Sequence, residues 1–523
     1  MKKLFRLLGA IAALGVIAPA YAQYNPVPVQ KAAGNKIYAH LMPWFESKEY
    51  SGYWGIHWTM ANKNPDSVDA SGRRQIAAHY YPLIGPYASG DPDLVEYQLL
   101  LMKLSGIDGV LIDWPGTTNA FDYVRNRQNS EAVINKINQV GLQFAVVYED
   151  HNLTLANVGD KLAQGRNDMA YLRDNYFNKS SHININDKPL LLTFGPQTFQ
   201  NANDWTNVFS VLPTKPYFLT LWYEHGEAGA NSQGEYSWIY QDGNSYINHL
   251  TNFYQNATNY GMKMGAAAPG FNAYYAEGGW GANPFVINHN GTNTFKSTLD
   301  LALNNGIQHI QLATWNDYGE GSMIEPTREF GYGFLTYLQQ RLGVSGLGQA
   351  ELELVHELYQ QRKRHKGNAT EQARLNNVFG YLVSLQTNAA RNLLNGTSPT
   401  NSIQIEAENY TVMNGVQTEA CAEGGRNVGW IDAGDWMVWD INLPSNGNYR
   451  VEYRVAGLSG GSIRLERAGA NPIYGTINVP VTGGWQHWQT IAHTVNLSAG
   501  QQQIAIYAPA GGYNINWIKF TKL

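Results

Sequence analysis

The sequence predicts an α/β chain: a (β/α)8 TIM-type barrel, then a helical hairpin, then a β-sandwich of the jelly-roll type. Three observations support this. Apolar strand-like runs alternate with amphipathic helical stretches over residues 36–344, helical spacing continues to residue 394, and short strands separated by Gly, Asn and Pro turns fill residues 403–523. A chain of 523 residues also exceeds one ordinary core, so at least two domains are expected.

Eight candidate strands define the barrel, with helical stretches between them that place apolar residues three and four positions apart. The strands are 36–42, 107–113, 142–148, 188–194, 217–222, 236–240, 262–268 and 307–313, and the clearest helices are 93–104, 129–140, 247–260 and 294–305. This alternation is what a TIM-type barrel requires. An open doubly wound sheet is the structural alternative, and the absence of a GxGxxG motif after the first strand disfavours it.

The N-terminus has the form of a signal peptide. Three basic residues among the first six precede an apolar run and Ala20-Tyr21-Ala22, so residues 1–22 are expected to be cleaved and the protein secreted, to the periplasm or beyond. The apolar run is too short for a good membrane span, and no later segment is long enough. Losing three positive charges moves the net charge from −5 to −8, which argues against a nucleic-acid partner.

The expected domains follow from these patterns. The barrel domain is 23–345, a hairpin of two helices joined near Gly367 packs on it over 346–394, a polar linker is 395–402, and the sandwich is 403–523. We expect a monomer. Cys421 is the single cysteine, which excludes an intrachain disulfide and cysteine-based zinc sites.

Acidic and aromatic residues recur where the predicted strands end. In a barrel these ends share one rim, where active sites form. A Tyr-, Trp-, Gly- and Pro-rich segment, including 52–60 and 79–93, is predicted to wall the same cleft as a long rim loop. The candidate substrate contacts at the strand ends are Trp44, Asp113, Trp114, Glu149, Trp222 and Glu224.

The densest such stretch is ATWNDYGEGSMIEP, residues 313–326, after the eighth strand. Glycoside hydrolysis usually needs two carboxyl groups, and Asp317 and Glu320 are the candidate catalytic pair. Trp315, Tyr318 and Glu325 are candidate substrate or loop contacts in the same turn. The residues leave open which acid holds the proton and whether the anomeric configuration is retained or inverted. A purely structural role, in which the acids cap a helix or pair with Arg328, is the alternative.

WNDYGEGSMIEP resembles the corresponding loop of two related hydrolase groups, the family 71 α-1,3-glucanases and the family 99 endo-α-mannosidases. HYYPLIGPYASGDPD and LLLMKLSGIDGVLIDWPG also look like the start of that superfamily's barrel. The resemblance implies that Asp317 and Glu320 are catalytic. Asp317 and Gly319 are closer to the glucanase pattern, whereas Glu320–Pro326 is closer to the mannosidase pattern.

The C-terminal motifs QIEAENYT, VGWIDAGDWMVWDINLP, GGWQHWQT and GGYNINWIKF resemble family 6 carbohydrate-binding modules. The resemblance implies that two aromatic rings, Trp430 and Trp485, clamp a sugar and that Asn514 hydrogen-bonds to it. It also implies a structural Ca²⁺ held by Glu406, Glu408 and Asn516, all hard oxygen ligands. The barrel carries no metal signature, and we expect catalysis without a cofactor.

Taken together, the sequence predicts a secreted, endo-acting polysaccharide hydrolase with a tethered binding module. An α-1,3-glucan is the first choice of substrate, with an α-mannan or an algal galactan as alternatives on the same fold. A non-catalytic glycan-binding protein is the main alternative of another class. A lyase for acidic glycans would require a basic cleft, whereas the rim motifs are acidic and aromatic. An esterase would require a GxSxG-type nucleophile elbow, which the sequence does not contain.

Overall fold

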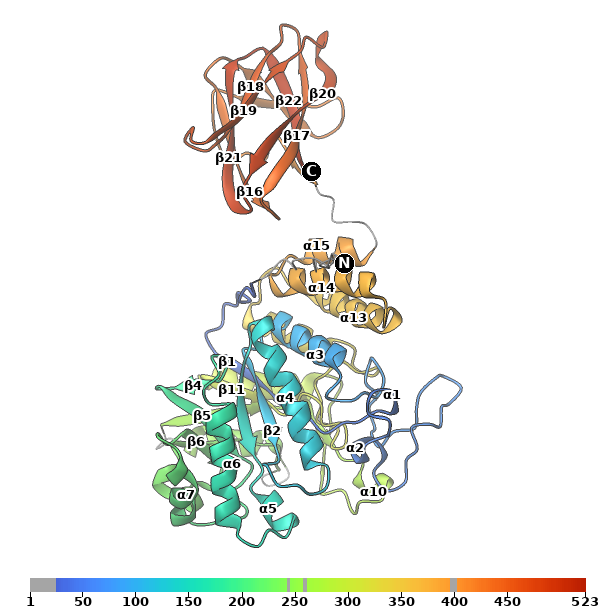
Figure 1. Cartoon of the computed structure of the whole chain (residues 1–523), viewed down its shortest axis with the longest axis vertical. Coiled ribbons are helices and arrows are strands. Elements are labelled where there is room, and N and C mark those ends of the chain that lie inside the picture. The colour runs from blue at the N-terminus through green and yellow to red at the C-terminus, as the bar shows by residue number, and fades with distance from the viewer. Residues whose placement is uncertain (1–24, 242–244, 257–260, 396–401) are drawn as a thin grey trace, which may run out of the picture. The chain divides into compact units, whose positions relative to one another are not determined.

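The computed structural model of this protein describes residues 25–241, 245–256, 261–395 and 402–523 (Figure 1). The predicted signal peptide, residues 1–22, lies outside the described residues, as does most of the predicted linker. The chain forms two compact units that meet in sequence between Leu394 and Asn395.

The first unit contains a closed barrel of eight parallel strands, as predicted. The strands pair in the order β3-β2-β1-β11-β8-β7-β6-β5, and β3 pairs with β5 to close the ring. A short strand, β4 (Asn184–Ile185), pairs antiparallel with β5. The barrel strands are β1 (Lys36–Leu41), β2 (Gly109–Trp114), β3 (Gln143–Tyr148), β5 (Lys188–Thr193), β6 (Tyr217–Leu221), β7 (Gly234–Tyr236), β8 (Met262–Ala267) and β11 (His309–Leu312).

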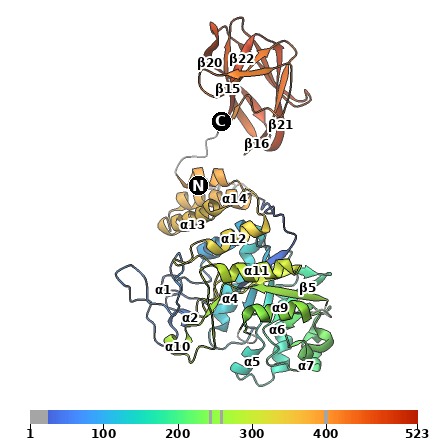
Figure 2. The ribbon, with the colours of Figure 1, turned by 180° about the vertical axis from the view of Figure 1, so that it is seen from behind.

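Helices surround the barrel, as the two opposite views show (Figure 1 and Figure 2). The longer ones are α3 (Pro92–Leu104), α4 (Tyr123–Val140), α6 (Lys161–Asn175), α7 (Ala202–Val208), α9 (Tyr246–Asn256), α11 (Asn293–Asn304) and α12 (Gly333–Leu342). Short elements lie in the loops: α1 (Lys48–Ser51), α2 (Ile56–Thr59), α5 (His151–Leu155), η1 (Phe209–Val211), α8 (His225–Ala228), η2 (Gly229–Asn231), β9 (Phe271–Asn272), α10 (Tyr275–Gly278) and β10 (Val286–Ile287). The end of the predicted helix 247–260 falls on residues that the structure leaves undescribed.

Strand β7 lies earlier in the chain than the predicted 236–240. Gly234 opens it, and a Cβ placed there would lie 1.9 Å from the carbonyl oxygen of Met262 on β8. Only glycine allows the two backbones to come this close. The prediction missed this strand start because glycine contributes nothing to an apolar pattern.

Three helices, not the predicted two, follow the barrel: α13 (Gln349–Arg364), α14 (Ala369–Val383) and α15 (Thr387–Leu394). Helix α13 packs against α3, which is therefore buried along almost its whole length. Arg362 and Glu96 form a buried ion pair with a nitrogen–oxygen distance of 2.9 Å across this contact. The prediction of two helices was wrong because Leu385, at a φ of 60°, breaks the second one without a Gly or Pro.

The second unit is a sandwich of two antiparallel sheets, as predicted. One sheet has the order β14-β15-β22-β17-β20, with β12 paired to β22, and the other has the order β13-β16-β21-β18-β19. Trp439 and several tyrosines fill the space between the sheets. The strands are β12 (Ser402–Glu406), β13 (Val412–Asn414), β14 (Gln417–Ala420), β15 (Arg426–Ile431), β16 (Trp436–Leu443), β17 (Gly447–Gly457), β18 (Gly461–Arg467), β19 (Ile473–Val479), β20 (Gly484–Leu497), β21 (Gly500–Ala510) and β22 (Tyr513–Lys522).

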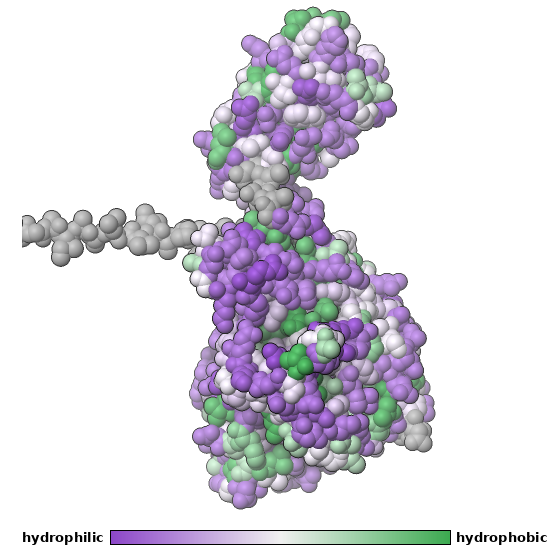
Figure 3. Space-filling model, turned by 90° about the vertical axis from the view of Figure 1, so that its right-hand side faces the viewer, coloured by the Kyte–Doolittle hydropathy of each residue, from purple (hydrophilic) through white to green (hydrophobic). Residues whose placement is uncertain are grey.

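The surface seen in Figure 3 is mostly hydrophilic, with hydrophobic side chains gathered in small groups on each unit. Scattered exposed apolar groups of this kind are normal on a folded protein. Among the helices of the described residues, none has the length and apolar character needed to cross a membrane.

Candidate active site and glycan-binding site

The turn after β11 places Asp317 and Glu320 at the C-terminal rim of the barrel. Its own hydrogen bonds fix its shape: the amide of Asp317 donates to Oγ1 of Thr314 at 2.8 Å, and the amide of Glu320 donates to Oδ1 of Asp317 at 2.9 Å. Gly321 continues the turn at a φ of +64°, in the left-handed region that favours glycine. The two carboxyl groups predicted to be catalytic are therefore held on one short, rigid segment.

Both carboxyl groups resist ionisation. Burial raises the pKa of Asp317 far above its ordinary value, and the charge of Glu320 raises it further. Burial also raises the pKa of Glu320, although the hydroxyl of Tyr275 donates to its Oε1 at 2.7 Å and favours the carboxylate. Two acids with raised pKa values, close enough to affect each other, are what proton transfer near neutral pH needs.

A second acidic pair, Asp113 and Glu149, faces the first from the ends of β2 and β3. Burial raises the pKa of Asp113 to about 7, and burial together with the charge of Asp113 raises the pKa of Glu149 well above its ordinary value. Asp113 also raises the pKa of Asp317, and Glu320 raises that of Glu149, so the four carboxyl groups share one centre. Four buried carboxyl groups this close together cannot all be ionised at once. Among them, Oδ1 of Asp113 is buried without a hydrogen-bond partner.

Asp113→Asn is expected to stabilise the protein at pH 8 by about 1–3 kcal/mol and to have little effect near pH 4. The pKa of Asp113 rises from an ordinary 3.8 to about 7 on folding, so the folded state binds the extra proton between these values. The wild-type free energy of unfolding therefore falls as pH rises from about 4 to 7, whereas asparagine does not titrate. Thermal unfolding of wild type and Asp113→Asn is measured between about pH 4 and pH 8. Asp187→Asn is the control variant, because Asp187 lies exposed in a turn. A difference that does not change with pH would contradict this prediction.

Four of the candidate contacts are buried: Trp114, Trp315 and Tyr318 expose no surface for a sugar, whereas Glu325 makes the loop contact that was its predicted alternative. Trp114 packs with Tyr148 and other rings in the layer between strand and helices. Trp315 and Tyr318 are also fully buried, and Glu325 is 1% exposed. All four side chains therefore pack within the protein, where a sugar does not reach them.

Glu325 instead ties the turn that carries Asp317 and Glu320, called the catalytic turn for its predicted role, to the rim loop. Its Oε2 accepts from the hydroxyls of Tyr87 at 2.7 Å and Tyr318 at 2.8 Å, and its Oε1 accepts from Nε2 of Gln98 at 2.7 Å. Hydrogen bonds to a charged acceptor each contribute about 1.5–3 kcal/mol. Glu325 therefore supports the site as a structural residue that joins the turn, the loop and α3.

Three other predicted contacts, Trp44, Trp222 and Glu224, stay partly accessible. Trp44, after β1, is half-buried and stacks on His57 with ring centroids 4.3 Å apart. After β6, Trp222 stacks on Tyr223 at 4.0 Å, and burial raises the pKa of the neighbouring Glu224. Trp222 and Glu224 share the rim with Asp113, Glu149, Asp317 and Glu320.

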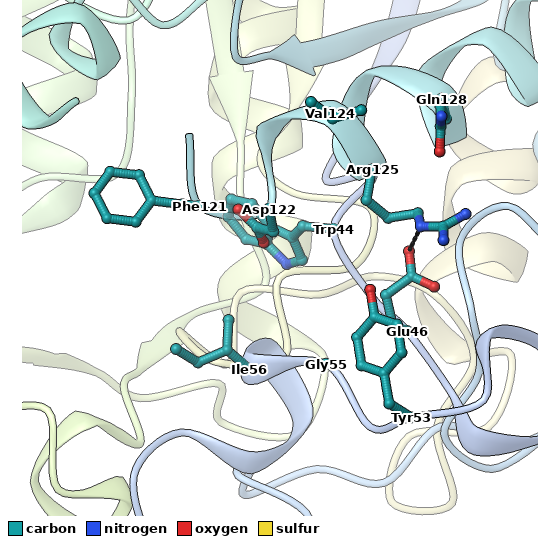
Figure 4. Close-up of a pocket in the computed structure, with 10 residues that line it drawn as sticks. All are labelled: Trp44, Glu46, Tyr53, Gly55, Ile56, Phe121, Asp122, Val124, Arg125 and Gln128. Atoms are coloured by element: carbon teal, nitrogen blue, oxygen red, sulfur yellow. Dashed lines mark ion pairs between the residues drawn. The ribbon is translucent and has the colours of Figure 1, made fainter. Parts of the chain in front are cut away.

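A cavity of about 530 Å³ lies on the Asp122 side of this acidic centre, and none of the four acids is among its lining residues. Asp122 forms part of its wall, raises the pKa of Asp113 and lies 3.2 Å from Nε2 of His57. Figure 4 shows Phe121 on the side opposite the ion pair of Arg125 and Glu46. The lining residues are Trp44, Glu46, Tyr53, Gly55, Ile56, Phe121, Asp122, Val124, Arg125 and Gln128.

Four residues of the site were not predicted from the sequence: His57, Phe121, Asp122 and Tyr275. Phe121 is 76% exposed at a φ of 46°, a conformation that costs a non-glycine residue about 1–3 kcal/mol. Its sequence signal is an aromatic residue inside the polar loop GTTNAFD. His57 lies in the predicted rim segment 52–60, whereas Asp122 and Tyr275 carry no local signal, because only the fold brings their loops to the site.

The predicted sugar clamp of the second unit forms a cavity of about 380 Å³. Trp430 and Trp485 are 54% and 44% exposed, whereas Asn514 is buried beneath them. Trp430 has a φ of 53° where β15 shifts register against β22, so a strained bulge presents the ring to solvent. The cavity is lined by Glu419, Trp430, Ile431, Asp432, Trp485, Gly512 and Asn514.

Glu419 also lines this cavity and was not predicted from the sequence. Its Oε1 accepts from Nδ2 of Asn514 at 2.7 Å and from Nε2 of Gln486 at 3.0 Å. The side chain of Asn514 also donates to the carbonyl of Trp485 at 2.9 Å. A charged acceptor therefore orients the amide that was predicted to hydrogen-bond to the sugar.

The predicted calcium ligands lie where the first and last strands of the sandwich pair. The amide of Ala407 donates to the carbonyl of Asn516 at 2.8 Å, which places Glu406 and Glu408 on either side of this bond. Oε2 of Glu408 is buried without a hydrogen-bond partner, as a metal-ligating oxygen would be. The described residues contain no group of three His, Cys, Asp or Glu that could hold a metal ion, so Asn516 would have to be the third ligand. These donors fit Ca²⁺, which binds carboxylate and amide oxygens.

Comparison with known proteins matches residues 406–522 to the model "Carbohydrate binding module (family 6)". The clotting factor G alpha subunit of Tachypleus tridentatus is 46% identical over 123 residues, which are 23% of this chain and 18% of that protein. This chain therefore spans about a fifth of the length of that relative. The CBM6cm-2 module of Cellvibrio mixtus lichenase 5A, solved with cellotriose, is 51% identical and matches 23% of this chain and 97% of its own, with a TM-score of 0.23.

The first unit is similar to a family 99 endo-α-mannosidase structure from Bacteroides thetaiotaomicron. The match is 17% identical, covers 59% of this chain and 97% of that one, and has a TM-score of 0.48. The closed parallel barrel of the first unit is established by its own strand pairing.

Proposed function

We propose, on the premise that residues 406–522 are a family 6 carbohydrate-binding module, that this chain is a secreted glycoside hydrolase. Its substrate is a polysaccharide, and an α-1,3-glucan is the first candidate. The enzyme cleaves bonds in the interior of the polymer. The observation that carries the proposal is the cluster of four interacting carboxyl groups at the C-terminal rim of the barrel, beside an open cavity. The WNDYGE pattern of residues 315–320 supports the glucan, and the following GSMIEP supports an α-mannan as the second candidate.

Asp317 and Glu320 perform the chemistry. One carboxyl group donates its proton to the leaving glycosidic oxygen, and the other carboxylate attacks the sugar or takes a proton from the attacking water. Burial raises the pKa of both carboxyl groups, which favours a proton on one of them. Asp113 and Glu149 bind sugar hydroxyls, since a pair that shares one proton can both donate and accept.

The cavity lined by Trp44, Phe121 and the Arg125–Glu46 pair receives the next sugars of the chain. Aromatic rings offer apolar faces to pyranose rings, and the ion pair offers donors and acceptors to hydroxyls. The module adds a second contact with the same polymer and so raises the local concentration of substrate. Export follows from residues 1–22, and the mature chain would begin at Gln23.

Product analysis on a glycan panel tests the function. Wild-type protein is incubated with α-1,3-glucan, α-mannan and a galactan, and new reducing ends and product sizes are measured. We expect oligosaccharides of intermediate size from α-1,3-glucan. Release from mannan alone would move the substrate to the second candidate. Binding without hydrolysis of any glycan would contradict the enzyme and favour a non-catalytic glycan-binding protein.

Calcium is expected to raise the unfolding temperature of the module by several degrees, and a chelator is expected to reverse this. If Ca²⁺ binds only to the folded state, it raises the free energy of unfolding by about 2.7 kcal/mol when its free concentration is about 100 times its Kd. Calorimetry of the full chain with and without Ca²⁺ measures the shift, and Glu408→Gln should abolish it while the exposed Asp440→Asn should not. Equal shifts in both variants, or no shift in wild type, would contradict a site at Glu406, Glu408 and Asn516.

A further inference from the structure

The catalytic turn is held from outside by the loop between β8 and α11, residues 268–292. The amides of Asn272 and Tyr274 donate to the carbonyls of Glu320 and Gly319, each at 2.8 Å. His289, near the end of the same loop, contacts the carbonyl oxygen of Gly321 through Nε2 at 2.8 Å. Three consecutive carbonyls of the turn, from Gly319 to Gly321, are therefore fixed by one neighbouring loop.

The chemistry of the partners determines the state of His289. A carbonyl oxygen only accepts, so Nε2 carries the hydrogen, and Nδ1 accepts from the hydroxyl of Tyr80 at 3.0 Å. The ring is buried and stacks on Phe330 with centroids 5.2 Å apart. Burial lowers the pKa of His289 to about 4, so the neutral ring keeps both hydrogen bonds at neutral pH.

Two glycines make this close arrangement possible. A Cβ on Gly270 would lie 2.7 Å from Nδ1 of His289, and a Cβ on Gly321 would lie 2.8 Å from the carbonyl oxygen of Asn272. The backbone is thus shaped to admit the imidazole beside the turn. His289 joins three segments that lie far apart in the sequence: the rim loop through Tyr80, its own loop, and the catalytic turn.

We propose that His289 is a positioning residue of the hydrolase. Its ring links the Gly321 carbonyl to Tyr80 and so holds in place the backbone that directs the Glu320 carboxyl group. This inference rests on the proposed function. His289 does not touch the reacting atoms. It acts through the backbone next to Glu320, whose side chain is held separately by Tyr275.

His182 provides a matched control. It is also buried and its Nδ1 lies 2.9 Å from a carbonyl oxygen, that of Ile183, but it contacts Phe144 rather than the catalytic turn. Both histidines are replaced by Leu, which removes the hydrogen bonds, and by Gln, whose amide still donates. Kinetics are measured at least 10 °C below each variant's unfolding temperature, together with hydrogen–deuterium exchange of residues 268–280 and 313–326.

His289→Leu is expected to lower kcat about 10- to 100-fold with KM changed less than about twofold, since a small displacement of a catalytic group has effects of this size. His289→Gln should recover part of kcat. Hydrogen–deuterium exchange of residues 268–280 and 313–326 should accelerate at least about tenfold in His289→Leu only. The His182 variants should keep kcat within about twofold. Equal kcat losses at both positions, or unchanged exchange in His289→Leu, would overturn the inference. If wild type cleaves no glycan, the proposed function fails, and the exchange result still decides whether His289 holds the turn.

Discussion

Asp317→Asn and Glu320→Gln are each expected to lower kcat by about 10²- to 10⁴-fold, the usual contribution of a positioned general acid or base. The amides keep the size of the side chains but can neither donate an acidic proton nor attack. Burial raises the pKa of both acids, and the charge of Glu320 raises the pKa of Asp317 further, so removing one charge should leave the barrel at least as stable at neutral pH. Loss of activity without loss of stability is therefore the expected signature of both variants.

Glu325→Gln is the matched comparison in the same turn. Its Oε1 and Oε2 accept hydrogen bonds from Tyr87, Tyr318 and Gln98, and a glutamine would turn one of these oxygens into a donor. This variant should unfold at a lower temperature, in contrast to the two catalytic variants. Steady-state kinetics on the best glycan and thermal unfolding measure both effects. Wild-type turnover in Asp317→Asn or Glu320→Gln would remove that residue from the mechanism.

Trp430→Gly is expected to weaken binding of the module to its glycan at least about 30-fold, the scale of a central aromatic contact. Glycine is the sharper substitution because it removes the ring and adopts the φ of 53° without strain. Hydrolysis of short soluble oligosaccharides should be unchanged, whereas hydrolysis of an insoluble polymer should fall, because the module acts by raising local substrate concentration.

Affinity electrophoresis or calorimetry against soluble glucans, with cellotriose included, measures this loss. Tyr474→Ala is the control, since Tyr474 is a half-buried aromatic on β19 outside the cavity. An unchanged Kd in Trp430→Gly would place the sugar site elsewhere on the module. An equal loss in Tyr474→Ala would mean that the module is generally destabilised.

The barrel could be predicted because periodic apolar runs mark each strand and carboxylates follow several of them. The errors have physical causes. Asp113 and Trp114 are neighbours at the end of β2, and adjacent strand residues point to opposite faces. Asp113 therefore faces the site, and Trp114 faces the helices. Alternation could have separated the two, whereas composition alone could not.

Other parts of the site depend on contacts that sequence order does not carry. Tyr275 reaches Glu320 from a position 45 residues earlier, and Glu419 reaches Asn514 from 95 residues away. Such pairs form only after the loops have been placed by the strands. The predicted sugar contacts Trp430 and Trp485, in contrast, stand in glycine-flanked turns, and both are exposed in the structure. Local chemistry thus predicted which rings face solvent but not which polar groups orient their partners.

The Glu325 contacts also constrain how this barrel can be re-engineered or can diverge. Tyr87 in the rim loop and Gln98 in α3 both donate to the carboxylate that closes the catalytic turn. A graft that replaces the rim loop alone would remove the Tyr87 donor from the buried Glu325 carboxyl group, so the loop, helix α3 and the turn must be exchanged together. The segment around Phe121 has no such tie to the turn. Shuffling there is the freer route to a new glycan preference.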